Sequence, residues 1–152
     1  MTPGDISKRV ASDRLAWIAE MVGEIRSLPL ANREQFFADR RNVWTAESCL
    51  RRALEALLDL GRHILAKGFG QGVTEYKEIA TEVQKHSVLS QPDAELLRIL
   101  AGYRNRLVHF YHEVEPEELY DISTLHLNDV ERLAGAFKVW LDSHSDWLDE
   151  SL

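Results

Sequence analysis

The chain has 152 residues, of which 45% are hydrophobic and 28% charged, and its formal net charge is −7. This length suits one domain, expected over residues 1–152, and this composition is typical of a globular protein rather than a disordered or membrane-embedded one. The negative charge argues against a general nucleic-acid coat protein, because affinity for phosphates depends largely on lysine and arginine.

The first nine residues carry mixed charge and lack the apolar core of a signal peptide. No apolar run along the chain approaches the roughly 20 residues that span a bilayer. We therefore expect a cytoplasmic protein that does not enter a membrane. The single cysteine, Cys49, suits a reducing compartment and is interpreted as a buried structural thiol.

Apolar residues recur at helical spacing along most of the chain, and signals for strands are scarce. Pro29 ends the first predicted helix, and Asn32 is a plausible N-cap for a long second helix that ends at a run of glycines. Ser90 begins a fourth helix, and Pro116 breaks the chain before the last one. We expect an all-α fold, an up-and-down bundle of four to five helices. The predicted helices span about residues 6–27, 32–67, 74–86, 90 to beyond 111, and 128–148.

The fourth predicted helix combines an apolar stripe with polar residues that the stripe does not explain. Residues at spacings of three and four share one side of a helix and predict its buried face. The stripe consists of Leu96, Leu100, Tyr103, Leu107, Phe110 and Val114. The polar residues outside it are Arg104, Asn105, His109, Tyr111 and His112.

Helical geometry places these polar residues on different sides. At about 100° per residue, Arg104 and Tyr111 share one flank, whereas Asn105 and His109 share another. Asn105 could then hydrogen-bond to His109 and fix its tautomer. On a continuous helix, Arg104 and His109 lie about 140° apart. Either the helix ends near this point, or two copies of the segment face each other across a dimer interface, and the sequence leaves both possibilities open.

Cleavage of a phosphodiester bond in RNA is the chemistry that Arg104 and His109 suit. A histidine can act as base or acid on the 2′-hydroxyl and the leaving oxygen, and an arginine can clamp the phosphate and stabilise transition-state charge. Residues 96–112 contain three arginines and no acid, although residues 113–152 hold eleven acids and only two bases. No metal or cofactor is predicted, because the 2′-hydroxyl is the nucleophile and His109-x-x-His112 lacks a third ligand at a recognised spacing.

The stretch from Ala101 to Tyr111 resembles the signature of the HEPN superfamily in its prokaryotic HepT-like toxin branch. That signature is an arginine, four intervening residues of which the first is usually asparagine, a histidine, one further residue and a tyrosine. Arg104, Asn105, His109 and Tyr111 fit it. The resemblance covers roughly residues 10–145.

The resemblance implies a homodimer in which two copies of the motif line one cleft. It implies a metal-independent RNA endonuclease with Arg104 and His109 as the catalytic pair and Asn105 in support. It also implies a toxin whose partner, a minimal nucleotidyltransferase antitoxin, silences it by transferring AMP to Tyr111. The alternative is a non-catalytic helical module that binds a nucleotidyltransferase or a nucleotide, with Arg104 and Tyr111 serving the interface. A plain structural dimer is a third reading, but it leaves the polar segment unexplained.

Overall fold

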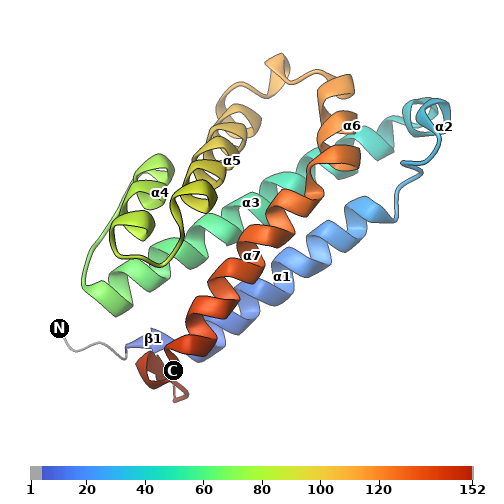
Figure 1. Cartoon of the computed structure of the whole chain (residues 1–152). Coiled ribbons are helices and arrows are strands. Elements are labelled where there is room, and N and C mark those ends of the chain that lie inside the picture. Colours follow the sequence, from blue (N-terminus) through green and yellow to red (C-terminus); the bar gives the residue numbers. More distant parts are fainter. Residues whose placement is uncertain (1–4, 152) are drawn as a thin grey trace.

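The longest helix, α3 (Arg40–Phe69), runs the length of the molecule, and the other helices pack around it (Figure 1). The computed structural model describes residues 5–151, except for the side chain of Tyr111. The all-α prediction is confirmed. No helix in this described part is long and apolar enough to cross a membrane. The remaining α-helices are α1 (Lys8–Arg26), α2 (Arg33–Ala38), α4 (Tyr76–Lys85), α5 (Gln91–His109), α6 (Pro116–Leu125) and α7 (Leu127–Ser143).

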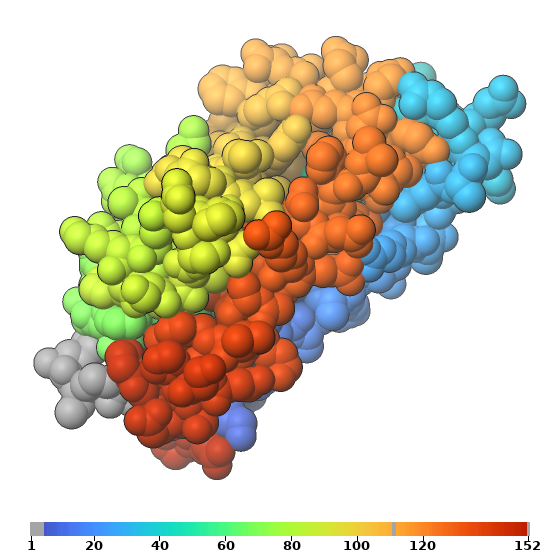
Figure 2. All heavy atoms as spheres, viewed as in Figure 1, coloured from blue at the N-terminus to red at the C-terminus, as the bar shows by residue number. Residues whose placement is uncertain are grey.

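The other long helices form two groups on opposite sides of α3. Helices α1 and α7 lie along one side of α3, and α4 and α5 pair with each other on the other side. Figure 2 shows the surfaces of α5, α6 and α7 adjoining each other on the face turned to the viewer, with α4 at the edge of α5. The polar segment lies at the end of α5, close to the beginning of α4. Both helix ends are therefore on the side of α3 away from α1 and α7.

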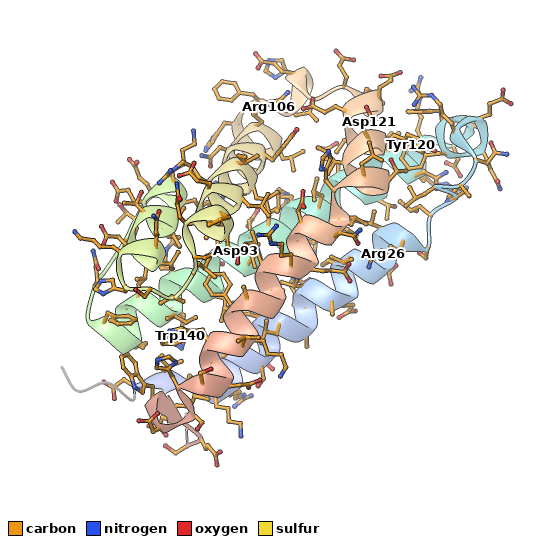
Figure 3. All side chains as sticks on the ribbon, viewed as in Figure 1. Arg26, Asp93, Arg106, Tyr120, Asp121 and Trp140 are labelled. Carbon is orange, nitrogen blue, oxygen red and sulfur yellow. The ribbon has the colours of Figure 1, made fainter. Side chains whose placement is uncertain are left out.

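Two short strands join the ends of the described chain. Strand β1 (Ile6–Ser7) pairs in parallel with β2 (Leu148–Asp149), which follows a 3₁₀ turn, η2 (Ser145–Trp147). Trp140 of α7, labelled in Figure 3, packs edge-to-face against Trp147 with ring centroids 5.6 Å apart. The sequence did not predict these strands, because two residues are too few to produce an alternating pattern. The predicted last helix accordingly ends at Ser143 rather than near residue 148.

The buried face of α3 forms much of the hydrophobic core, as its apolar spacing predicted. Trp44 lies on the same helix but is 60% exposed. Cys49 is half-buried, and burial raises the pKa of its thiol, so it carries little of the reactive thiolate. The large α3 side chains that are buried as predicted are Leu50, Leu54, Leu57, Leu58, Ile64 and Leu65.

The predicted second helix is two helices, because Asp39 interrupts it. Asp39 has extended backbone angles, and its Oδ1 accepts a hydrogen bond from the backbone N–H of Arg41 at 2.9 Å. It therefore acts as the N-cap of α3, a role in which aspartate competes effectively with a continuing helix. The break turns Phe36 of α2 fully into the core, where its ring contacts Tyr120 with a centroid distance of 5.0 Å.

Helix α5 ends at His109, earlier than the apolar stripe predicted. Phe110 caps the helix and is 50% exposed rather than buried. A 3₁₀ turn, η1 (Tyr111–Glu113), then turns the chain back toward the bundle. Val114 is buried as predicted, but it follows this turn and does not belong to α5. Arg106, near the top of Figure 3, donates to both carboxylate oxygens of Glu118 at 2.6 and 3.0 Å. The sequence reading had placed no helix at α6.

Gly61 gives a test of how closely α3 packs. A Cβ there would lie 2.9 Å from Cγ2 of Ile79 and 3.3 Å from Cζ of Phe137, both on fully buried side chains. Overpacking of this kind costs about 1–3 kcal/mol, which exceeds the gain of roughly 1 kcal/mol in helix propensity. We therefore expect Gly61→Ala to lower the free energy of unfolding by about 1–2 kcal/mol in urea titrations.

The matched control is Gly135→Ala in α7, where a Cβ meets nothing within 4 Å. It should leave stability unchanged or raise it by up to about 1 kcal/mol. Equal effects of the two substitutions would contradict the close packing at Gly61.

His63 makes the attachment of β1 to α3 dependent on pH. Its Nε2 accepts a hydrogen bond from the backbone N–H of Ser7 at 3.0 Å. Burial, reinforced by the charges of Lys67 and Arg14, lowers the pKa of His63 below its ordinary value. The unfolded chain therefore takes up this proton more readily, and stability present above pH ~6.5 is lost as the pH falls through the lower folded-state pKa.

We expect the free energy of unfolding to fall between pH 7.5 and pH 5.5, and to fall less in His63→Gln, since glutamine keeps an acceptor that does not titrate in this range. His126→Gln, at an exposed histidine, is the control. If wild type and His63→Gln lose the same stability over this range, His63 does not carry the effect.

Candidate active site

The last turns of α5 open into a cavity of about 500 Å³. Arg104, Asn105 and His109 all line it, with Phe110 at the end of the helix. The opposite wall comes from Arg62 of α3 and from residues 74–77, where the loop after α3 enters α4. The structure therefore brings Arg104 and His109 to one pocket within a single chain.

The end of α5 does not change the angle between these two residues. The helix ends at His109, so Arg104 and His109 are both helical and still lie about 140° apart around its axis. The cavity borders both of them, and whether a second copy of the segment completes the site stays open. His109 is exposed and lies beside Phe110 with ring centroids 6.4 Å apart. Among the described residues no side chain donates to or accepts from its imidazole, so both ring nitrogens are available to a ligand.

Arg104 is held against the pocket wall. Its side chain is 19% exposed, and its Cζ lies 4.5 Å from the centre of the Tyr76 ring. Its Nε is buried and lies 3.9 Å from Oε1 of Glu55, too far for a hydrogen bond. Glu55 is itself bound by Arg51 at 2.9 Å, so its charge is shared between two arginines.

Asn105 contacts Arg104, not His109 as the helical spacing suggested. Its Oδ1 accepts a hydrogen bond from Nη1 of Arg104 at 3.3 Å. Asn105 thus supports the arginine of the motif, and the predicted bond that would fix the histidine tautomer is not formed in this structure. The reason is that the amide turns toward the neighbouring guanidinium, where a carbonyl oxygen meets a positive charge.

The side chain of Tyr111 lies outside the described residues. Its backbone begins η1, after α5 has ended. The helical projection that put Tyr111 on the flank of Arg104 therefore does not apply, because it assumed a continuous helix through both residues. The residue remains two positions beyond His109 in the chain, next to the cavity-lining Phe110.

The three arginines of residues 96–112 do not form one cationic patch in the folded protein. Arg98 is bound by Glu95 at 2.6 Å and Arg106 by Glu118, so these two arginines are largely neutralised. Lys77, exposed in the first turn of α4, has no acidic partner within the described part of the chain and lines the cavity. It also borders a neighbouring hollow of about 480 Å³ that Asn105 and Phe110 share.

Sequence reasoning missed the cavity residues outside α5, which are Arg62, Thr74, Glu75, Tyr76 and Lys77. No motif spacing connects them to residues 104–111, because they reach the site through tertiary packing of α3 and α4 against α5. The described residues also contain no group of three or more histidine, cysteine, aspartate or glutamate side chains that could hold a metal ion.

Comparison with known sequences identifies relatives of this chain. The sequence model of a family described as ribonuclease HepT-like matches residues 18–137, a span that includes α5 and the whole cavity. A curated relative, the tRNA nuclease HepT of Aphanizomenon flos-aquae, is 24% identical over 117 residues, which cover 76% of this chain and 79% of the relative.

Solved structures share the fold. A HEPN toxin of Shewanella oneidensis, solved in a tri-AMPylated form in complex with an MNT antitoxin, has a TM-score of 0.76 and 22% identity, with 86% of this chain and 97% of that chain covered. A cytosolic protein of unknown function from Bacillus subtilis, YutE, has a TM-score of 0.73 and 16% identity, with 91% and 93% covered. At these identities the likeness establishes the fold.

Proposed function

The chain belongs to the family of HepT-like ribonucleases, and from that premise we propose that it is a toxin of a two-gene toxin–antitoxin pair that cleaves RNA in the cytoplasm without a metal ion. The observation that carries the proposal is that Arg104 and His109 line one open cavity, whose other charged residues are Lys77, Arg62 and Glu75. Arginine and histidine are the group types that RNA cleavage through the 2′-hydroxyl requires.

His109 and Arg104 have separate roles in the proposed reaction. His109 removes the proton of the 2′-hydroxyl, O2′ attacks the adjacent phosphorus, and the bond from phosphorus to the 5′ oxygen breaks. Arg104 binds the phosphate and stabilises the charge that accumulates on its oxygens in the transition state. The leaving oxygen takes up a proton, and the products are a 2′,3′-cyclic phosphate and a 5′-hydroxyl. Asn105 supports Arg104 through their hydrogen bond.

We propose a homodimer as the working form, in which a second copy of the motif lies in the same cleft. A second His109 there would supply the acid for the leaving oxygen while the first acts as base, since one imidazole cannot hold and release the proton at the same moment. The exposed Phe110 and Ile99, which are 50% and 58% exposed, border the hollow next to the cavity and offer apolar surface for such an interface.

We propose that a minimal nucleotidyltransferase silences the toxin by transferring AMP to Tyr111. Support comes from the Shewanella oneidensis relative in fold, which was solved tri-AMPylated with an MNT antitoxin. A nucleotide attached two residues beyond His109 would add negative charge and bulk to the segment that follows the cavity-lining Phe110. It would compete with RNA phosphate for Arg104 and Lys77, as charge-adding modifications do through local electrostatics.

Expression with and without the partner tests this function. Expression of the chain alone should arrest growth and shorten cellular RNA, and co-expression with an active nucleotidyltransferase should restore growth and raise the intact mass by whole AMP units on Tyr111. His109→Ala expressed alone should permit growth. Growth unaffected by folded, unmodified wild-type protein would favour the non-catalytic binding module over the nuclease.

Lys77 should contribute to RNA binding rather than to the chemical step. An exposed lysine that contacts one phosphate is worth about 0.4–1 kcal/mol, so Lys77→Ala should raise KM for RNA about two- to fivefold and leave kcat unchanged. The slope of log KM against the logarithm of the salt concentration should also fall by about one, because one phosphate contact is lost.

Lys85→Ala, at an exposed lysine at the opposite end of α4, is the matched control and should change neither value. Equal effects of Lys77→Ala and Lys85→Ala would show that general surface charge, rather than a contact at the cavity, attracts the RNA.

A further inference from the structure

The ring of Tyr76 lies beneath two guanidinium groups. The Cζ atom of Arg104 is 4.5 Å from the ring centre, and that of Arg62 is 4.8 Å from it. Both distances fall in the range of a favourable interaction between a cation and an aromatic face. Arg104 belongs to α5, Arg62 to α3 and Tyr76 to α4, so this stack joins three helices at the wall of the cavity.

Tyr76 is fixed to α3 independently of Arg104. Its hydroxyl donates to Oδ1 of Asp59 at 3.4 Å, and Nη1 of Arg62 donates to the same oxygen at 3.3 Å. Arg62 also donates from Nε to the carbonyl of Val73 and from Nη2 to the carbonyl of Thr74, each at 3.0 Å. The two bonds from Arg62 to the carbonyls attach the loop before α4 to α3. The bond of the Tyr76 hydroxyl is itself long, so the anchored loop is what chiefly holds the ring in place.

Arg104, by contrast, has few other contacts that could orient it. Its side-chain hydrogen bond to the adjacent Asn105 is long at 3.3 Å, and its Nε lies 3.9 Å from Oε1 of Glu55. An arginine side chain loses much conformational freedom when it is ordered, so a site that needs it in one place must supply a surface for its plane. Within the described residues, the Tyr76 ring is that surface.

We propose that Tyr76 is a positioning residue for Arg104, whose ring holds the guanidinium plane against the cavity wall so that the remaining N–H groups point at the scissile phosphate. The proposal rests on the proposed RNA cleavage, because it concerns the same site. The proposed role belongs to the ring of Tyr76, whose hydroxyl lies 3.4 Å from Oδ1 of Asp59. Burial and the charge of Asp59 raise the pKa of Tyr76, which keeps the phenol neutral beside the two arginines.

Two substitutions at Tyr76 separate the ring from its hydroxyl. Tyr76→Phe keeps the ring and should stay within about twofold of the wild-type kcat for RNA cleavage, whereas Tyr76→Leu removes the aromatic face and should lower kcat about 10- to 100-fold, the usual cost of a misplaced catalytic group. KM should change much less, because Lys77 and other contacts still bind the substrate. Equal losses in both variants, or an unchanged kcat in Tyr76→Leu, would overturn the proposal.

Phe37→Leu is the matched control, since Phe37 lies under Arg33 at 4.9 Å in a similar stack outside the cavity. It should leave kcat unchanged. Urea unfolding of each variant sets the conditions under which all are folded, so that kcat refers to native protein.

A second readout does not depend on nuclease activity. In NMR spectra the Nε–H signal of Arg104, assigned by its loss in Arg104→Lys, should be shifted upfield by the ring in the wild type and in Tyr76→Phe, and should move to the ordinary arginine position in Tyr76→Leu. If the wild type cleaves no RNA, the proposed function fails while this shift still decides whether Tyr76 holds Arg104. An Arg104 signal that is the same in Tyr76→Leu as in wild type would overturn the positioning role whatever the activity.

Discussion

His109→Ala should lower kcat for RNA cleavage about 10²- to 10⁴-fold, the range that general acid–base catalysis contributes. The side chain is exposed at the last residue of α5, and it makes no hydrogen bond with another described residue. Its removal should therefore leave the free energy of unfolding within about 0.5 kcal/mol of the wild type. Initial rates with an end-labelled RNA, together with urea unfolding, measure both quantities.

His112→Ala is the control for His109→Ala. His112 is also exposed and lies three positions further on, but it does not line the cavity. It should retain wild-type kcat. A His109→Ala variant as active as His112→Ala would remove His109 from the reaction and leave Glu75 as the carboxylate of the cavity that could act as a base.

Arg104→Ala should lower kcat about 10²- to 10³-fold, the cost of removing one group that stabilises transition-state charge. Arg104→Lys should recover only part of this loss, because an ammonium group keeps the charge but not the planar fork that stacks on Tyr76 and binds a phosphate through two N–H groups. Steady-state kinetics at a saturating RNA concentration separate this effect on kcat from any effect on KM.

Arg98→Ala is the matched control for Arg104→Ala, since Arg98 is on the same helix but is bound by Glu95 and Thr81 outside the cavity. It should have no effect on kcat. If Arg104→Lys were fully active, a point charge would suffice at this position, and neither the fork nor the stack on Tyr76 would be needed.

The sequence predicted the helical class and much of the core because helical spacing records burial directly. It failed where one residue decides a boundary. Asp39 splits the predicted second helix because its side chain caps α3, which no periodic pattern reveals. The apolar spacing of α5 predicted that Phe110 is buried, but the helix ends one residue earlier and leaves Phe110 half exposed.

The candidate site divides in the same way. Arg104 and His109 could be singled out because they share a short segment of recognisable spacing, and they do line one cavity. Tyr76 and Arg62 could not, because their relation to Arg104 arises only when α3 and α4 pack against α5. Asn105 lines the same cavity, but its hydrogen-bond partner depended on a side-chain rotamer that sequence does not determine.

The central claim is that this chain cleaves RNA through the 2′-hydroxyl and without a metal ion. The most direct test incubates the unmodified wild-type protein in EDTA with an RNA and with the same RNA carrying a 2′-deoxy nucleotide at the mapped cleavage position. We predict cleavage of the first, with a 2′,3′-cyclic phosphate end, and no cleavage of the second at that position. Intact RNA in EDTA that is cut once Mg²⁺ is added, or cleavage at the deoxy position, would contradict the account.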